Sequence, residues 1–261
     1  MRAGKAAGAQ VAPHGAERGA RLMAWDESHY ADADALSAAL ADALAQACSE
    51  ALDRHGRAWL ALAGGRTPLP AYRRLARADL DWSKITVLPT DERCVAHAHP
   101  ACNVAALRAA FADATGLTIA SLTTADGDAA ASLAHAQAWL APWHDTPFDA
   151  VVLGMGGDAH TASLFPGATG LAAALDPDGS ADACALVPDP LRPEAPFARI
   201  SLTLPRLLRS QRLWLAITGE DKRAVLRRAQ TATAPGLDAL RMPVAAILHA
   251  PDTVVRIHWS P

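Results

Sequence analysis

Three short segments of this sequence place glycines, acids and bases together in patterns that could do chemistry. The first is Gly64-Gly65-Arg66-Thr67-Pro68. Glycines leave main-chain amides open to a ligand, and Pro68 can open a helix whose first amides bind an anion. The segment can therefore hold a phosphate, although an ordinary strand-to-helix turn would use the same residues. It is not a P-loop, because no Gly-Lys-Ser/Thr follows.

The second segment, residues 154–166, combines a histidine with an acid. Its glycines clear space around Asp158 and His160, which are two positions apart. An imidazole beside a carboxylate can act as a general base, with the carboxylate orienting the ring. The alternative is a histidine that makes only structural hydrogen bonds. We favour the catalytic interpretation because the pair lies in a glycine-rich loop directly after an apolar run.

The same loop also fits the dinucleotide-binding pattern loosely, through Gly154, Gly156 and Ala159. Such a site needs a full helix after the glycines and then a second strand that ends in an acid. Pro166 and Gly167 would end the helix within about two turns. NAD binding is therefore the weakest interpretation of this segment.

The third segment, Asp91-Glu92-Arg93, contains two adjacent acids. Either could take part in proton transfer, or both could be solvated surface groups. Four possible zinc ligands follow it, namely Cys94, His97, His99 and Cys102. Their spacing matches none of the usual paired ligands and Pro100 stiffens the loop, so we expect no metal here.

Two cations further along the chain, Arg199 and Lys222, could complete a phosphate site. Each alone would be interpreted as a surface charge. Together with Gly64 and Gly65 they could form its cationic side, because these side chains are the usual partners of phosphate oxygens. The sequence has no Gly-x-Ser-x-Gly elbow, His-Glu-x-x-His or Walker motif. A hydrolase built on this chain would therefore work without a covalent serine.

The elements around these segments decide whether they meet. Short apolar runs without strict alternation indicate strands buried on both faces. We expect strands at residues 58–63, 85–90, 150–153, 213–218, 244–249 and 254–259. Helical patterns lie at residues 32–55, 69–77, 104–111, 129–140 and 222–230. This alternation predicts a mainly parallel, doubly wound sheet in a three-layer α/β/α sandwich, which binds ligands beyond the carboxyl ends of its strands.

The chain is expected to form one α/β domain over residues 22–261. Residues 1–21 are rich in Ala and Gly and lack apolar periodicity, which is typical of a disordered leader. Residues 167–196 are rich in Asp, Gly and Pro, so we expect an exposed and irregular loop there.

Composition excludes several classes of protein. The chain has 24 basic and 27 acidic residues, a formal net charge of −3, so no global positive field would hold nucleic acid or an anionic membrane. Four cysteines in 261 residues are too few for a disulfide framework. No apolar run is long enough to cross a membrane or to direct export. We expect a cytoplasmic protein without a nucleic-acid or membrane partner, either a monomer or a weak homodimer.

Taken together, the motifs resemble those of the 6-phosphogluconolactonases. The resemblance rests on Gly64-Gly65-Arg66-Thr67-Pro68, Asp91-Glu92-Arg93, His99, Pro100, Asn103, residues 154–166 and Arg199. Order and spacing agree from about residue 25 to residue 259, and Asp-x-His-Thr-Ala-Ser-Leu-Phe-Pro is highly specific. That family is related to the glucosamine-6-phosphate deaminases and shares their α/β/α fold. The resemblance implies hydrolysis of 6-phosphoglucono-δ-lactone to 6-phosphogluconate, the second step of the oxidative pentose phosphate pathway, without an obligatory cofactor.

The resemblance also implies roles for individual residues. His160 would deprotonate the attacking water, and Asp158 or another carboxylate such as Asp91 would hold its imidazole. Asn103, or main-chain amides of residues 154–157, would stabilise the oxyanion. The phosphate would be bound by Gly64, Gly65, Arg66, Thr67, Arg199 and Lys222.

Some positions depart from residues that are common in the family. Ala63 and Cys102 stand where serine is common, and Ala159 stands where glycine is common. At Ala159 a Cβ lies between Asp158 and His160, and a turn that needs a positive φ there would be strained. We expect a small local shift with activity retained.

Two alternatives remain open. One is the sister deaminase–isomerase activity on an amino-sugar phosphate, and the other is a non-catalytic sugar-phosphate sensor. The deaminase pattern continues to Asn-Glu-Pro, with a glutamate in the catalytic machinery, where this chain has Leu164-Phe165-Pro166. Phenylalanine cannot transfer a proton, so the sequence favours lactone hydrolysis.

Overall fold

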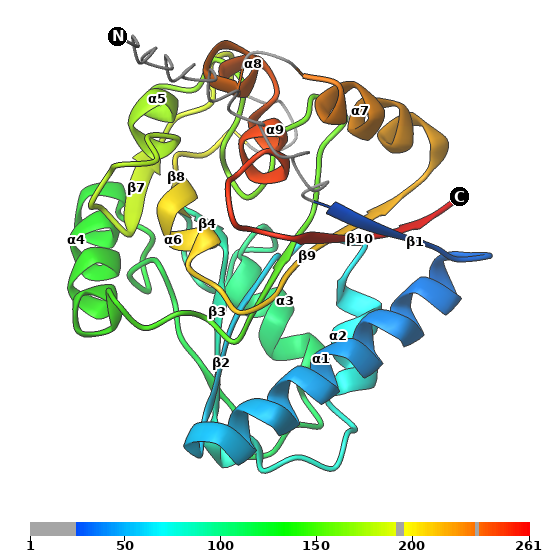
Figure 1. Cartoon of the computed structure of the whole chain (residues 1–261). Coiled ribbons are helices and arrows are strands. Elements are labelled where there is room, and N and C mark those ends of the chain that lie inside the picture. Colours follow the sequence, from blue (N-terminus) through cyan, green and yellow to red (C-terminus); the bar gives the residue numbers. More distant parts are fainter. Residues whose placement is uncertain (1–24, 192–195, 233–234) are drawn as a thin grey trace, which may run out of the picture.

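The computed structural model describes residues 25–191, 196–232 and 235–261. The leader predicted for residues 1–21 lies outside them. A seven-stranded parallel sheet runs through the centre (Figure 1). Its order is β1 (Trp25–His29), β10 (Val255–Ser260), β9 (Leu213–Thr218), β6 (Ala150–Leu153), β2 (Ala58–Leu62), β3 (Ile85–Pro89) and β5 (Thr118–Ile119). The predicted three-layer, mainly parallel α/β/α fold is confirmed.

Alternate residues of each central strand pack on opposite faces of the sheet. In β2, Leu60 and Leu62 contribute to one core, whereas Trp59 and Ala61 contribute to the other. The first core is closed by α1 (Ala33–His55), α2 (Leu69–Leu75) and α3 (Asn103–Ala110). The second is closed by α4 (Ala129–Leu140), α5 (Leu171–Ala174), α6 (Leu204–Leu208), α7 (Glu220–Gln230), α8 (Pro235–Arg241) and α9 (Pro243–Leu248). Burial on both faces explains why the strands are continuous apolar runs.

A second, smaller sheet lies at one end of the second layer. It is antiparallel, in the order β4 (Asp91–Arg93), β8 (Arg199–Leu202) and β7 (Ala183–Leu186). Two short 3₁₀ helices, Trp82–Lys84 and Ala141–Trp143, complete the elements of the described residues. The small sheet places Arg93 directly opposite Arg199, although 106 positions separate them in the sequence.

The ends of helix α1 follow from its sequence. The Asp32 carboxylate accepts a hydrogen bond from the main-chain N of Ala35 at 2.8 Å, which caps the first turn. Gly56 ends the helix with φ +73°, a left-handed conformation that glycine adopts without strain. Leu36, Leu40, Leu44 and Cys48, spaced four positions apart, lie on the buried face of the helix.

Two predictions about secondary structure are wrong. Residues 244–249 form helix α9 rather than a strand, because Pro243 opens a helix and the whole apolar turn is buried in the second core. Residues 167–196 are not one irregular loop, since they contain α5 and β7, and β7 pairs with β8. Among the described residues, no helix combines the length and the apolar character needed to cross a membrane.

Candidate active site

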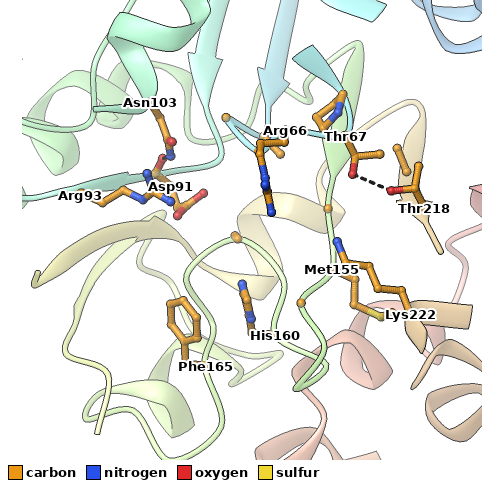
Figure 2. A pocket seen from close by; sticks show the side chains of 18 of the residues that line it. Arg66, Thr67, Asp91, Arg93, Asn103, Met155, His160, Phe165, Thr218 and Lys222 are labelled. Atoms are coloured by element: carbon orange, nitrogen blue, oxygen red, sulfur yellow. Dashed lines mark hydrogen bonds between the residues drawn. The ribbon is translucent and has the colours of Figure 1, made fainter. Parts of the chain in front are cut away.

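A pocket of about 930 Å³ opens beyond the carboxyl ends of β2, β6 and β9 (Figure 2). This is where an open parallel sheet usually binds its ligands. Nine of the ten predicted site residues line it: Gly64, Gly65, Arg66, Thr67, Asp91, Asn103, His160, Arg199 and Lys222. The tenth, Asp158, does not line the pocket but contacts His160. The fold therefore brings together residues from all three sequence motifs.

His160 lies in the loop after β6 and is held by Asp158. Its Nδ1 is 2.5 Å from Asp158 Oδ1, and the same oxygen accepts a hydrogen bond from the main-chain N of His160 at 3.3 Å. A carboxylate on Nδ1 fixes the proton on that nitrogen, which leaves the lone pair of Nε2 free. Because a quarter of the His160 side chain is exposed and lines the pocket, Nε2 is the atom a ligand can reach.

Burial keeps the imidazole of His160 neutral. It lowers the pKa of His160 to about 4 and is the largest cause of the shift. Asp91 acts in the opposite direction, whereas the positive charges of Arg199, Lys222 and Arg93 lower the pKa further. At neutral pH this histidine is an unprotonated base in a cationic pocket.

The loop that carries His160 depends on two unusual main-chain positions. A Cβ at Gly156 would lie 2.1 Å from both Nδ1 and Cε1 of His160, so only glycine allows the imidazole to approach this closely. Ala159 adopts φ +66°, and its carbonyl accepts a hydrogen bond from the main-chain N of Val244 at 3.0 Å. A non-glycine residue in this conformation is strained by roughly 1–2 kcal/mol.

Asp91 and Asn103 form the opposite wall of the pocket. Ser163 donates its hydroxyl to Asp91 Oδ2 at 2.5 Å, which ties the wall to the His160 loop. Asn103 Nδ2 donates to the main-chain O of Asp91 at 2.6 Å. Gly64 permits this packing, because a Cβ there would lie 2.3 Å from Asn103 Oδ1.

The donors available to an oxyanion are fewer than the sequence suggested. One N–H of the Asn103 amide already donates to Asp91. The main-chain N of Gly156 donates to the carbonyl of His160 at 2.9 Å. The proposed amide of Gly156 is therefore not available to an oxyanion.

Glu92, the other acid of the third motif, has a structural role. Its side chain is buried and accepts hydrogen bonds from the main-chain N of Arg93, Asn103 and Val104 at 2.7–2.8 Å. Cys102 adds a thiol donor at 3.4 Å. Burial raises the pKa of Glu92, and the three main-chain donors oppose that rise. The acid therefore caps helix α3 and fixes Asn103 instead of reaching the pocket.

We expect Glu92→Gln to lower the free energy of unfolding by about 2–3 kcal/mol, since hydrogen bonds to a charged group contribute about 1.5–3 kcal/mol and the new amide faces main-chain donors. Urea or thermal unfolding measures the loss. Glu50→Gln is the matched control, because Glu50 is an exposed acid on α1 that pairs with Arg212, and it should unfold almost as the wild type does. Equal stability of all three proteins would contradict the capping role.

Two further cations, Arg66 and Lys222, line the pocket. Arg66 follows β2, and Lys222 lies in the first turn of α7. Figure 2 shows both side chains extending toward the centre of the pocket. Burial lowers the pKa of Lys222, and the charge of Arg66 lowers it further, so the two cations lie close together. Neither forms an ion pair within the described part of the chain. Thr67 Oγ1 and Thr218 Oγ1, 3.3 Å apart, add hydroxyl groups beside them. This end of the pocket suits a phosphate.

Arg93 is a pocket residue to which the sequence analysis assigned no role. Its guanidinium donates to the main-chain O of Ala101 at 2.6 Å and lines the pocket beside Arg199. The signal that could have found it is its place at the end of the third motif, two positions after Asp91. Arg93 and Arg199 give the pocket a second cationic side, close to His160.

The four possible zinc ligands do not converge. Cys102 donates to Glu92, His99 accepts from the main-chain N of Ala101 at 3.1 Å, and His97 contacts Ser121 and Thr123. In the part of the chain that the structure describes, no three His, Cys, Asp or Glu side chains gather as metal ligands.

Comparison with known proteins gives a consistent result. The sequence model of the family described as glucosamine-6-phosphate isomerases/6-phosphogluconolactonase matches residues 31–259. A 6-phosphogluconolactonase of Pseudomonas aeruginosa is 38% identical over 85% of this chain and 89% of its own length. One of Caulobacter vibrioides is 37% identical over 85% of this chain and 91% of its own length. The crystal structure of a 6-phosphogluconolactonase from Shewanella baltica is 32% identical with a TM-score of 0.81, over 90% of this chain and 97% of that one.

Proposed function

Because this chain belongs to the glucosamine-6-phosphate isomerase and 6-phosphogluconolactonase family, we propose that it hydrolyses 6-phosphoglucono-δ-lactone to 6-phosphogluconate. This is the second step of the oxidative pentose phosphate pathway. The observation that carries the proposal is a neutral histidine base, fixed by a carboxylate, in the same pocket as a cationic site for a phosphate.

In this mechanism Nε2 of His160 takes a proton from a water molecule as its oxygen attacks the lactone carbonyl carbon. Asp158 stabilises the imidazolium through the hydrogen bond at Nδ1. The tetrahedral oxyanion lies near the positive charge of Arg93, and the second N–H of Asn103 is a further donor. The bond to the ring oxygen then breaks, and the imidazolium returns its proton to that oxygen. No covalent intermediate forms, because a lactone is already an activated ester.

The phosphate group provides binding energy far from the reacting carbonyl. Arg66, Thr67 and Lys222, with Gly64, Gly65 and Arg199, would bind it and so orient the lactone ring over the base. Holding reactants in a productive geometry converts binding energy into rate. A direct assay on freshly generated 6-phosphogluconolactone, corrected for spontaneous hydrolysis, tests the proposal. A rate equal to that of the blank would refute it.

The proposal extends to the substrate class, the partners, the oligomeric state and the location of the protein. We infer a small-molecule sugar-phosphate substrate, no nucleic-acid or membrane partner, and a monomer or weak homodimer in the cytoplasm. The small negative net charge supports the absence of a nucleic-acid partner. Sedimentation at several protein concentrations measures the oligomeric state.

We expect no release of ammonia from glucosamine 6-phosphate above the blank, in a preparation that hydrolyses 6-phosphogluconolactone readily. Phe165 occupies the position of the deaminase glutamate, and its ring can neither accept nor donate a proton. Ammonia release measured with a coupled assay checks this. Ammonia without lactonase activity would favour the deaminase, and tight sugar-phosphate binding with neither activity would favour a sensor.

A further inference from the structure

The imidazole of His160 lies against an aromatic ring that the mechanism above does not use. The ring centroids of His160 and Phe165 are 4.1 Å apart, and the two planes are inclined by 33°. Phe165 is only 4% exposed and comes from the same loop, five positions later. Figure 2 shows the two rings next to each other at the edge of the pocket.

This contact matters because the hydrogen bond to Asp158 does not by itself fix the imidazole. Rotation of a histidine ring about its last torsion has a broad and shallow energy profile. The ring can therefore tilt about the Nδ1 hydrogen bond unless neighbouring atoms prevent it. The main chain of Gly156 lies against the Nδ1–Cε1 edge of the imidazole, and the ring of Phe165 covers part of its surface.

Phe165 also contacts one of the cations near the base. The guanidinium carbon of Arg199 is 5.0 Å from the centroid of the Phe165 ring, a favourable distance for a cation over an aromatic ring. Arg199 is 2% exposed and is one of the charges that act on His160. A single apolar ring therefore packs against both the base and a buried cation, and it occupies space that water could otherwise fill.

We propose, on the basis of the function proposed above, that Phe165 is a positioning residue for the base: its ring fixes the tilt of the His160 imidazole with Nε2 toward the pocket and excludes water from that side. Phe165 does not touch the reacting atoms in this scheme. It acts through His160, so its loss changes turnover more than substrate binding.

The test compares Phe165→Leu, Phe165→Tyr and a control, Phe148→Leu. Leucine keeps apolar bulk but removes the flat ring, whereas tyrosine keeps the ring. Phe148 is the matched control because it is a fully buried aromatic residue just before β6. The guanidinium of Arg206 lies 4.0 Å from its ring, and the Trp59 ring packs against it at a tilt of 55°. It lies at the opposite end of that strand from His160.

We expect Phe165→Leu to lower kcat about 10–100-fold with KM within threefold, because displacement of a catalytic group by about 1 Å can cost about 10² in rate. Phe165→Tyr should stay within threefold of the wild type in both constants. Phe148→Leu should lower the melting temperature but leave kcat unchanged. Calorimetry with 6-phosphogluconate should give affinities within threefold for all four proteins, which confirms that the pocket is assembled.

A second readout does not depend on turnover. Since burial is the main reason for the low pKa of His160, water that enters beside leucine should move this pKa from about 4 toward its ordinary value of 6.5. An NMR titration of the histidine signals measures this pKa. The signal of His160 is identified as the one that is absent from the spectrum of His160→Gln. The pH at which kcat/KM falls on acidification should also move upward.

Several results would overturn the inference. One is that Phe165→Leu has the kcat and the His160 pKa of the wild type. Another is that Phe165→Leu changes KM but not kcat. A third is that Phe148→Leu loses as much kcat as Phe165→Leu does. If the wild type hydrolyses 6-phosphogluconolactone no faster than the blank, the proposed function itself fails. If His160→Ala retains full activity, the assignment of the base fails and the inference about Phe165 fails with it. If His160→Ala is inactive and Phe165→Leu is normal, only the inference about Phe165 fails.

Discussion

His160→Ala should lose about 10²–10⁴ of kcat toward 6-phosphogluconolactone, the range typical for loss of a general base, while binding of 6-phosphogluconate changes only a few-fold. The reason is that Nε2 of His160 is the free nitrogen of a neutral, oriented imidazole that lines the pocket, whereas the proposed phosphate site consists of other residues. Steady-state kinetics with the spontaneous rate subtracted measures the loss, and calorimetry measures product binding.

The chain offers a matched control for this variant. Burial also lowers the pKa of His258 to about 4, and His258 Nδ1 contacts the Tyr30 hydroxyl at 2.9 Å, away from the residues that line the pocket. His258→Ala should keep its kcat. Unchanged turnover in His160→Ala, or equal losses in both variants, would contradict the assignment of the base.

The pH dependence of the wild type follows from the same shift. A base whose folded pKa is about 4 is protonated and inactive below that pH, so kcat/KM should fall on acidification through about pH 4 and be level above about pH 5. Stability has a related dependence, because the folded pKa lies below the unfolded value of about 6.5. The contribution of neutral His160 is therefore complete above about pH 6.5 and is lost as the pH falls from there to 4. His160→Gln should lose less stability across this window.

Loss of a single cation at the phosphate end should weaken binding of 6-phosphogluconate by about 10–100-fold, since a hydrogen bond to a charged group contributes about 1.5–3 kcal/mol. We expect this of Lys222→Ala, Arg66→Ala and Arg199→Ala. Non-phosphorylated gluconolactone should be a poor substrate of the wild type and hardly a worse one for the variants. Calorimetry and the lactonase assay give the two measurements.

Lys84→Ala is the control for Lys222→Ala. The chain has three lysines, and Lys84 is an exposed one that pairs with Asp81 at 2.8 Å. Its removal should leave product binding unchanged. Normal binding of the phosphorylated product by Lys222→Ala and Arg199→Ala would place the phosphate elsewhere.

Much of the architecture could be predicted because buried parallel strands are apolar on both faces. The runs at β2, β3, β6 and β9 were unambiguous, and their carboxyl ends located the pocket. The apolar run of α9 looks like a strand in the sequence, because a helix buried on all sides is as continuously apolar as a buried strand. Only Pro243, which can open a helix, separates the two possibilities. The short strand β7 has only four residues, and its pairing with β8 is a long-range contact that no local pattern contains.

The site was predicted as a set of residues but not as an arrangement. Glycines beside His160 indicated close packing, yet the sequence did not specify what packs there. The contact of Phe165 with His160 and the capping of α3 by Glu92 both depend on side-chain directions set by the fold. Adjacent acids look alike in a sequence, and only their geometry separates Asp91, which lines the pocket, from Glu92, which does not.

The capping of α3 by Glu92 has a consequence for how this part of the chain exchanges with solvent. The first amides of a helix usually lack partners and are among the fastest to exchange hydrogen for deuterium. At Asn103 and Val104 these amides instead point into a buried carboxylate. The start of α3 should therefore fray less than its other end, and deuterium uptake at two main-chain positions reports whether the wall of the pocket is intact, even in the absence of substrate.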